Sequence, residues 1–175
     1  MKNLQLVDDG GFVKRYHTQH TIHQQTVGHH SFNVAWICEF ITAGAASRNL
    51  LMAALQHDIA EFHVGDVPAP TKRRVTEVKE LFDAIENEVL IEHGHPDYVS
   101  MLTDEEKAIL KVADCLEGML FCLRELKMGN LHAETAYHNF QNYAASRIAN
   151  ELPFRFHDRA DRIYDFIFEE RSKLP

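Results

Sequence analysis

Four residues of metal-binding type stand out in the sequence: His30, the adjacent pair His57 and Asp58, and Asp114. They lie at or beside helical apolar stripes, where an unpaired charged side chain is costly. Taken singly, an aspartate in such a place is usually capping or salt-bridged, and a His-Asp pair recurs often by chance. Taken together, two imidazoles and two carboxylates suit one first-row divalent cation such as Zn, Co, Mn or Fe.

A cation held by these four residues would keep room for water and for a phosphate oxygen. Such an ion lowers the pKa of bound water and neutralises charge on a phosphoryl group. Adjacent helical residues point about 100° apart, so His57 and Asp58 reach one ion only if it lies over the flank or end of their helix. His30 and Asp114 would then arrive from neighbouring helices. A site of this kind is suited to metal-assisted hydrolysis of a phosphate.

Apolar residues at helical spacing predict the elements that would position these groups. We expect helices from Gly28 to about Ala43, from a Ser47 cap into His57-Asp58, from a Thr71 cap to near Gly94, from a Thr103/Glu106 capping box to Gly129, and over residues 131–149 and 158–172. Residues 12–27 and 64–70 are expected to be loops. No segment alternates as a strand does, which predicts an all-α fold in a single domain over residues 1–175.

Composition excludes several kinds of partner. The formal net charge is −8, and the one cationic cluster is residues 72–74, which argues against a nucleic-acid polymer as partner. No apolar run approaches the roughly eighteen residues of a membrane span, and the first eleven residues lack an apolar signal core. The three cysteines form no CxxC pair, as expected of reduced thiols. We therefore expect a cytoplasmic protein (in the host cytoplasm, if it is of phage origin).

The motifs resemble a known family. His30, His57-Asp58 and Asp114 resemble the H…HD…D signature of the HD-domain phosphohydrolases. Arg15-Tyr16 and residues 25–31, 57–61, 65–72 and 111–116 resemble the bacterial HD-domain 5′-deoxynucleotidases. They also resemble a bacteriophage branch that hydrolyses dATP to deoxyadenosine and triphosphate. The likeness covers residues 12–126 and implies a single HD-domain helical bundle, with helices 131–172 added at its C-terminus.

The resemblance also assigns roles near the metal. Glu61 would orient or activate the attacking water, or protonate the leaving oxygen; it follows His57 by four residues, which predicts the same helical face. Asp66 would hold the sugar hydroxyl or a ligand histidine, although a turn-forming aspartate is an equal alternative. Arg15 and Lys72 would clamp phosphate, although Lys72 heads a Lys-Arg-Arg run typical of a solvated face.

Contacts with the rest of the substrate follow from the same resemblance. Thr18, His20 and Ile22 lie in the segment that resembles the base-contacting region of the phage enzymes, with residues 68–70 as the opposite wall. Tyr16 stands where the nucleotidases usually carry Trp, and can still stack on a sugar or base. His29 stands where they carry Glu, which could favour a more anionic substrate. The family register selects His30, rather than His29, as the ligand.

The function expected from these residues is metal-dependent hydrolysis of a deoxynucleotide 5′-phosphate. We favour a dATP or dNTP triphosphohydrolase, and the alternative is a 5′-deoxynucleotidase acting on dNMPs. A rival from another class is a non-catalytic nucleotide-sensing module, but Glu61 argues against it because a binder needs no water-activating group. The resemblance further implies a small deoxynucleotide substrate, added Mg or Mn on its phosphates, and a homo-oligomer, either dimer or hexamer.

Overall fold

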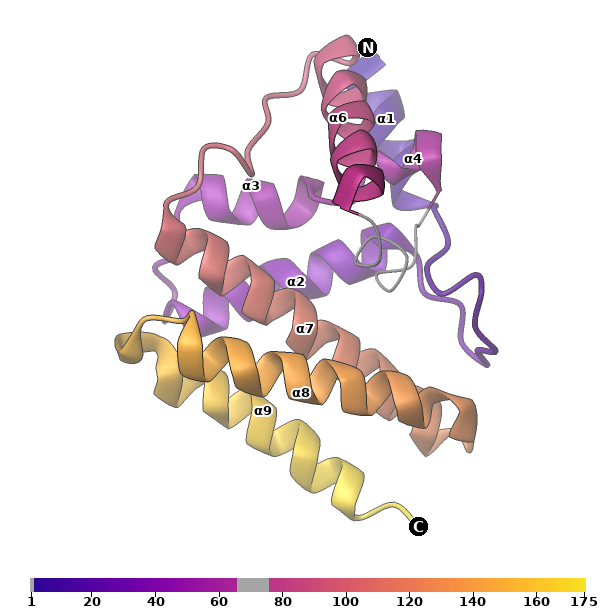
Figure 1. Ribbon diagram of the computed structural model, residues 1–175, viewed down its shortest axis with the longest axis vertical. Helices are drawn as coiled ribbons and strands as arrows, with labels where there is room; N and C mark the ends of the chain where they lie inside the picture. The colour runs from indigo at the N-terminus through magenta and orange to yellow at the C-terminus, as the bar shows by residue number, and fades with distance from the viewer. Residues whose placement is uncertain (1, 66–75) are drawn as a thin grey trace.

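Helices make up the regular structure of the chain, whose computed structural model describes residues 2–65 and 76–175 (Figure 1). In chain order they are α1 (Lys2–Gly11), α2 (Val27–Ile41), α3 (Arg48–Gln56), α4 (Glu61–Val64), α6 (Thr76–Glu92), α7 (Asp104–Lys127), η1 (Leu131–Ala133), α8 (Glu134–Asn150), η2 (Phe154–Phe156) and α9 (His157–Ser172). Within the described ranges no strand forms, and Lys14 and Thr26 make an isolated antiparallel bridge. The prediction of an all-α fold is confirmed.

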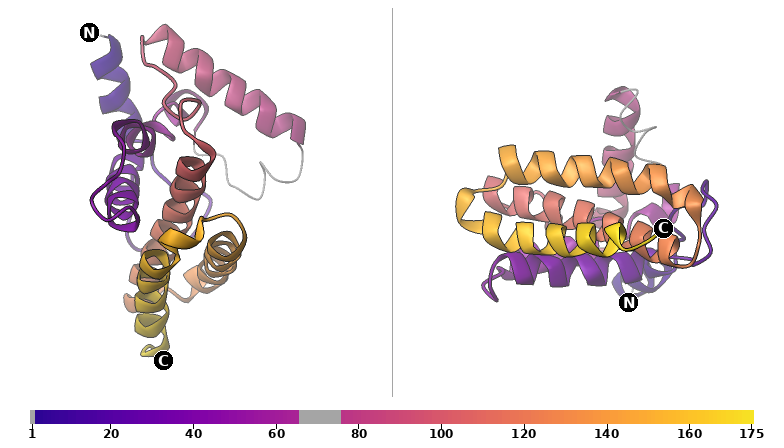
Figure 2. Two further views of the ribbon diagram at one scale, coloured as in Figure 1. Left: turned by 90° about the vertical axis from the view of Figure 1, so that its left-hand side faces the viewer. Right: turned by 90° about the horizontal axis from the view of Figure 1, so that it is seen from below.

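Helix α7 is the central element of the main core. It packs against α2, α3, α8 and α9, and Figure 2 shows it running between α8 and α2. It begins with the predicted capping box, in which the side chains of Thr103 and Glu106 each accept from the backbone N–H of the other. Helices α2 and α3 are also capped by side chains at their N-termini. The side chain of Thr26 accepts a hydrogen bond from the backbone N–H of His29, and that of Ser47 accepts one from the backbone N–H of Leu50. These caps satisfy N–H groups that the helices leave unpaired.

A smaller core forms where α1, α4 and α6 meet above α2 (Figure 1). The sequence did not predict α1, because only Leu6 and Gly10 of its ten residues are buried. Gly10 permits the close approach, since a Cβ there would lie 2.4 Å from the carbonyl oxygen of Ile59. Helix α1 therefore lies directly against the turn that carries His57 and Asp58.

Two helix boundaries differ from the predictions. Helix α3 ends at Gln56, with His57 as its C-cap, and residues 57–60 form a turn before α4 begins at Glu61. The prediction that His57 and Glu61 share one continuous helical face is therefore wrong. The helix expected from Thr71 is described only from Thr76. In the described part of the chain, no helix has both the length and the apolar character needed to cross a membrane.

Candidate metal centre

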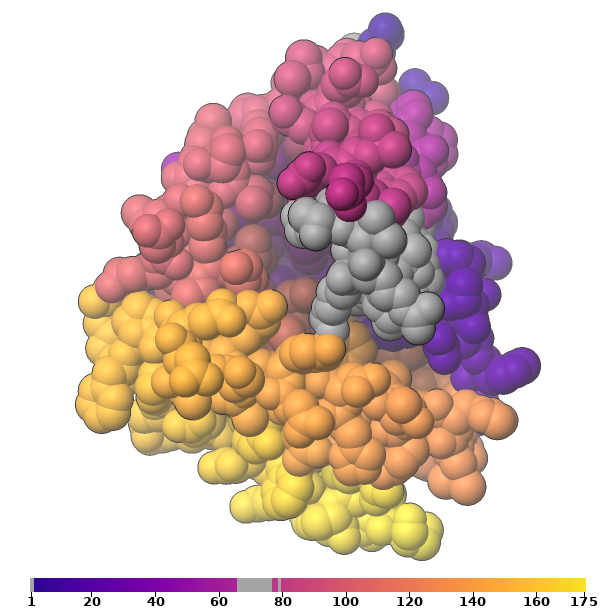
Figure 3. All heavy atoms as spheres, in the orientation of Figure 1, coloured from indigo at the N-terminus to yellow at the C-terminus, as the bar shows by residue number. Residues whose placement is uncertain are grey.

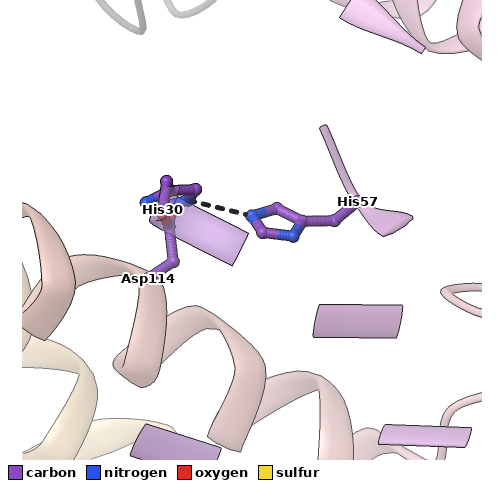
Figure 4. A group of neighbouring side chains, drawn as sticks. All are labelled: His30, His57 and Asp114. Atoms are coloured by element: carbon purple, nitrogen blue, oxygen red, sulfur yellow. Dashed lines mark hydrogen bonds and ion pairs between the residues drawn. The ribbon is translucent and has the colours of Figure 1, made fainter. Parts of the chain in front are cut away.

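Three predicted ligands converge from separate elements (Figure 4). His30 lies in the first turn of α2, His57 follows α3, and Asp114 lies in α7. The Nε2 atom of His30 is 3.2 Å from Nε2 of His57 and 3.3 Å from Oδ1 of Asp114. Ligand atoms around a tetrahedral zinc ion lie about 3.3 Å apart, given bond lengths near 2 Å. The three side chains are therefore spaced as ligands of one ion are.

The fourth predicted ligand, Asp58, lies beside the two histidines. Its Oδ2 atom is 3.5 Å from Nε2 of both His30 and His57. The same carboxylate accepts a hydrogen bond from the guanidinium of Arg15. The turn after α3 thus directs two adjacent side chains toward one point, which the sequence argument required of an ion at a helix end.

Each histidine is held by a hydrogen bond on the far side of its ring. Nδ1 of His30 lies 2.7 Å from Oε2 of Glu117, and Nδ1 of His57 lies 2.8 Å from the carbonyl oxygen of Ala54. A carbonyl oxygen and an ionised carboxylate can only accept hydrogen bonds, so each histidine ring, when neutral, carries its proton on Nδ1. Both Nε2 lone pairs then face the centre, which is the arrangement a divalent cation needs.

The ionisation of the centre follows from its contacts. Burial lowers the pKa of His30, but hydrogen bonds with Asp114 and Glu117 outweigh burial and raise the pKa to about 9. Burial raises the pKa of Glu117, but its hydrogen bond with His30 and the charge of that ring lower the pKa overall. Burial also raises the pKa of Asp114, but the hydrogen bond with His30 and the charge of that ring lower the pKa overall. The centre therefore holds negative charge that a proton on His30 offsets, and a cation can replace that proton.

A cavity of about 450 Å³ reaches the centre at His57. Its walls come from the end of α3, from α6, from the connection to α7 and from the first turns of α7, and Figure 3 shows the surface hollowed between α6 and α7. It is lined by Gln56, His57, Ala60, Asp83, Glu86, Asn87, Leu90, Asp97, Val99, Ser100, Lys107 and Leu110. The volume falls within the range typical of small-molecule sites.

Residues 4–153 match the family model described as 5′-deoxynucleotidase YfbR-like. The chain belongs to this family. A 5′-deoxynucleotidase of Pectobacterium atrosepticum is 26% identical over 162 residues, which are 81% of this chain and 81% of the relative. The fold matches the cyanophage S-2L HD phosphohydrolase DatZ, solved with dA and one catalytic Zn²⁺ ion (TM-score 0.74, 23% identity, 96% and 95% of the two chains). It also matches an HD-domain phosphohydrolase of Listeria innocua (TM-score 0.66, 21% identity, 98% and 91% of the chains).

The resemblance drawn from the motifs is thus confirmed, and the chain is an enzyme of the HD-domain phosphohydrolase type.

Arg15 and Tyr16, the Arg-aromatic pair of this YfbR-like chain, take different positions. The Arg15 side chain is 12% exposed and lies against Asp58. The Tyr16 ring stacks on Phe121 of α7, with centroids 4.4 Å apart and planes 5° apart. Burial raises the pKa of the Tyr16 hydroxyl. Since Phe121 covers one face of the ring, at most the opposite face is available to a sugar.

The segment predicted to contact the base is anchored by residues that sequence reasoning missed. Thr18 and His20 are exposed, and Ile22 is 59% exposed. Glu125 accepts from the backbone N–H of Ile22 and of His23, both at 2.7 Å. Asn130 donates to Glu125 at 2.6 Å and to the carbonyl of His20 at 2.7 Å. Their side chains hold residues 20–23 against the end of α7.

Of the remaining predicted site residues, Glu61 is buried and the others lie outside the described residues. Glu61, the first residue of α4, is 4% exposed and is not among the three converging ligands. Asp66, Lys72 and residues 68–70 lie outside the described residues. Glu117 is a further residue that the sequence analysis missed. Its position three residues after Asp114, on the same side of α7, was the available signal.

Proposed function

We propose that this chain is a divalent-metal-dependent 5′-deoxynucleotidase, which hydrolyses deoxynucleoside 5′-monophosphates to deoxynucleosides and orthophosphate. The observation that carries the proposal is the convergence of His30, His57 and Asp114 in a chain of the YfbR-like family. The cavity supports a small-molecule substrate, because one of the three converging side chains, His57, forms part of its wall.

The ligands proposed for the metal are His30, His57, Asp58 and Asp114. Two imidazole nitrogens with lone pairs facing inward and two carboxylates fit a first-row divalent cation, and we propose Zn, Co or Mn. When bound, such an ion supplies charge neutralisation at the phosphoryl group and a lowered pKa for water. The cyanophage enzyme, which carries one catalytic Zn²⁺ ion, supports a metal of this class.

The chain's own residues would hold and polarise the substrate. Arg15 lies against Asp58, so its guanidinium is within reach of a phosphate bound at the centre and can bind two of its oxygens. Lys72 is proposed as a second phosphate contact and Asp66 as the partner of the sugar hydroxyl. Glu61 is proposed to position the attacking water or to protonate the leaving oxygen. Tyr16 would contact the sugar, and Thr18 and Ile22 the base.

The monophosphate is preferred over the triphosphate that the sequence alone favoured. The curated relatives are named 5′-deoxynucleotidases, whereas the likeness to the phage enzyme, at 23% identity, supports the fold alone. His29 does not favour a triphosphate either. Burial and the charge of Arg124 lower the pKa of His29, so this residue is neutral at pH 7 and adds no positive charge for a longer phosphate chain.

The test is to incubate the purified protein with dAMP or dATP in the presence of Mn²⁺, Co²⁺ or Zn²⁺ and to identify the anion released. Orthophosphate from dAMP supports the proposal, and triphosphate from dATP would favour the triphosphohydrolase, with added Mg²⁺ or Mn²⁺ on the phosphates. Hydrolysis of neither substrate would remove both assignments. Glu61→Ala should abolish turnover while nucleotide binding persists, and Glu151→Gln, on an exposed helix end, serves as the control.

We also propose that the enzyme is a homo-oligomer, either a dimer or a hexamer. Support comes from exposed aromatic side chains on one side of α2 and on α9: Phe32, Trp36, Phe40 and Phe166, which are 55%, 62%, 46% and 57% exposed. Large apolar side chains in this density are typical of association surfaces. Light scattering of the purified protein measures the assembly directly, and a monomer at all concentrations would contradict the proposal.

A further inference from the structure

We infer that Glu117 is a positioning residue for the metal ligand His30, and that its carboxylate sets the metal affinity of the centre. This inference rests on the metal-dependent function proposed above. Glu117 lies in α7, is 0% exposed, and places Oε2 at 2.7 Å from Nδ1 of His30. A buried charge of this kind persists only when its partners satisfy it.

The two proposed histidine ligands differ in the group that accepts the hydrogen bond from Nδ1. His57 donates Nδ1–H to the neutral carbonyl of Ala54, whereas His30 donates to the carboxylate of Glu117. A hydrogen bond to an ionised acceptor is roughly twice as strong as one to a neutral acceptor. It draws the ring proton toward the carboxylate and makes Nε2 a stronger electron donor toward a cation. Because of Glu117, His30 should be the more strongly held of the two rings.

The other oxygen of Glu117 is committed to different donors. Oε1 accepts from Nε2 of Gln25 at 2.7 Å and from Nδ2 of Asn33 at 3.0 Å, and Nη2 of Arg124 lies 3.4 Å away. These donors require an acceptor at Oε1, and His30 requires one at Oε2. A glutamine at position 117 offers one acceptor and one donor. It can therefore satisfy only one side of this network.

The chain offers a matched control at Glu125. This residue also lies in α7, is also 0% exposed, and also accepts from amide donors. Its hydrogen-bond donors are Ile22, His23 and Asn130, and none of them is a proposed metal ligand. Glu117→Gln and Glu125→Gln therefore make the same chemical change in the same helix, and differ in whether a ligand histidine loses its partner.

The experiment is a Zn²⁺ titration of the metal-stripped proteins against a chromophoric chelator. We expect Glu117→Gln to raise the Kd for Zn²⁺ by about 10–100-fold, the range for residues that support a metal-bound histidine. Glu125→Gln should stay within about threefold of wild type. In zinc-loaded protein, NMR should show faster solvent exchange of the His30 Nδ1–H proton in Glu117→Gln, with the His57 proton unchanged.

The outcomes of the Zn²⁺ titration separate the inference about Glu117 from the proposed metal centre and the proposed function. A Kd for Glu117→Gln within threefold of wild type, or an equal rise in Glu125→Gln, would overturn the inference. Should Glu117→Gln not fold, Glu117→Asp keeps the charge but shortens the side chain by one methylene, which withdraws the carboxylate from Nδ1 of His30, and a Kd equal to wild type would also overturn the inference. Failure of wild type to bind Zn²⁺ would reject the metal centre itself. Zinc binding without hydrolysis would reject only the proposed function.

Discussion

Replacing Glu125 with alanine should detach the backbone of Ile22 and His23 from α7. The carboxylate accepts three hydrogen bonds, from the backbone N–H of Ile22 and of His23 and from the side chain of Asn130. Burial raises the pKa of Glu125, but the bonds from Asn130 and from those backbone groups lower the pKa overall. The residue is therefore charged at neutral pH, and its three donors bind an ion rather than a neutral acceptor.

The size of the effect follows from what happens to the donors. A hydrogen bond to a charged group contributes about 1.5–3 kcal/mol net. Ile22 and His23 are exposed residues, so water can replace the acceptor of their N–H groups. Asn130 is 7% exposed and keeps its bond to His20. Three bonds partly replaced in this way predict a loss of about 2–4 kcal/mol in unfolding free energy, or a fall in Tm of roughly 5–15 °C.

Thermal and urea unfolding measure the loss, and hydrogen exchange at the amides of Ile22 and His23 locates it. Glu151→Gln provides the control, because Glu151 forms an exposed i,i+4 pair with Arg147 and its loss should change stability by no more than about 0.5 kcal/mol. If Glu125→Ala and Glu151→Gln lower stability equally, or if the two amides remain protected, the anchoring role is wrong.

Three further outcomes are expected. Asp114→Asn should keep the fold, by circular dichroism, and lose metal-dependent hydrolysis by more than the roughly 10–100-fold typical of a residue that only supports a ligand; activity near wild type would remove Asp114 from the centre. Gly10→Ala should lower the free energy of unfolding, measured in urea, by about 2 kcal/mol. The new Cβ would lie 2.4 Å from the backbone oxygen of Ile59, and this clash costs more than the ~1 kcal/mol gained in helix propensity. A variant more stable than wild type would contradict the prediction. Because folding lowers the pKa of Glu125, its contribution is complete above the unfolded pKa of about 4.3 and is lost as pH falls through the folded pKa. The stability gap between wild type and Glu125→Gln should therefore narrow below about pH 4, and a constant gap would refute the ionised state.

The helices that local chemistry specifies were predicted from the sequence. Ser47 and the Thr103/Glu106 pair cap their helices as expected, because these side chains satisfy N–H groups within their own turn. The break between α3 and α4 was not predicted. No glycine or proline interrupts residues 56–61, so the pattern predicted a continuous helix. In the structure the turn lies where Gly10 of α1 packs closely against Ile59.

The supporting residues of α7 were not predicted from the sequence because two faces of this helix are buried. The stripe Val112, Cys115, Met119 and Cys122 was interpreted as core, and all four are buried. Asp114, Glu117, Phe121 and Glu125 follow at intervals of three, four and four residues, and so share a second face. Glutamates at such positions usually face water, and a tertiary structure is needed to show them at 0% exposure.

Through this second face, α7 positions several groups besides the proposed ligand Asp114. One straight helix carries the proposed ligand Asp114, the partner of His30, the ring that stacks on Tyr16, and the anchor of residues 20–23. Eleven residues at a rise of about 1.5 Å separate Asp114 from Glu125, a span of roughly 16 Å. Backbone hydrogen bonds within α7 therefore help to fix the distance between the metal centre and the anchored segment, together with the hydrogen bond from Gln25 to Glu117.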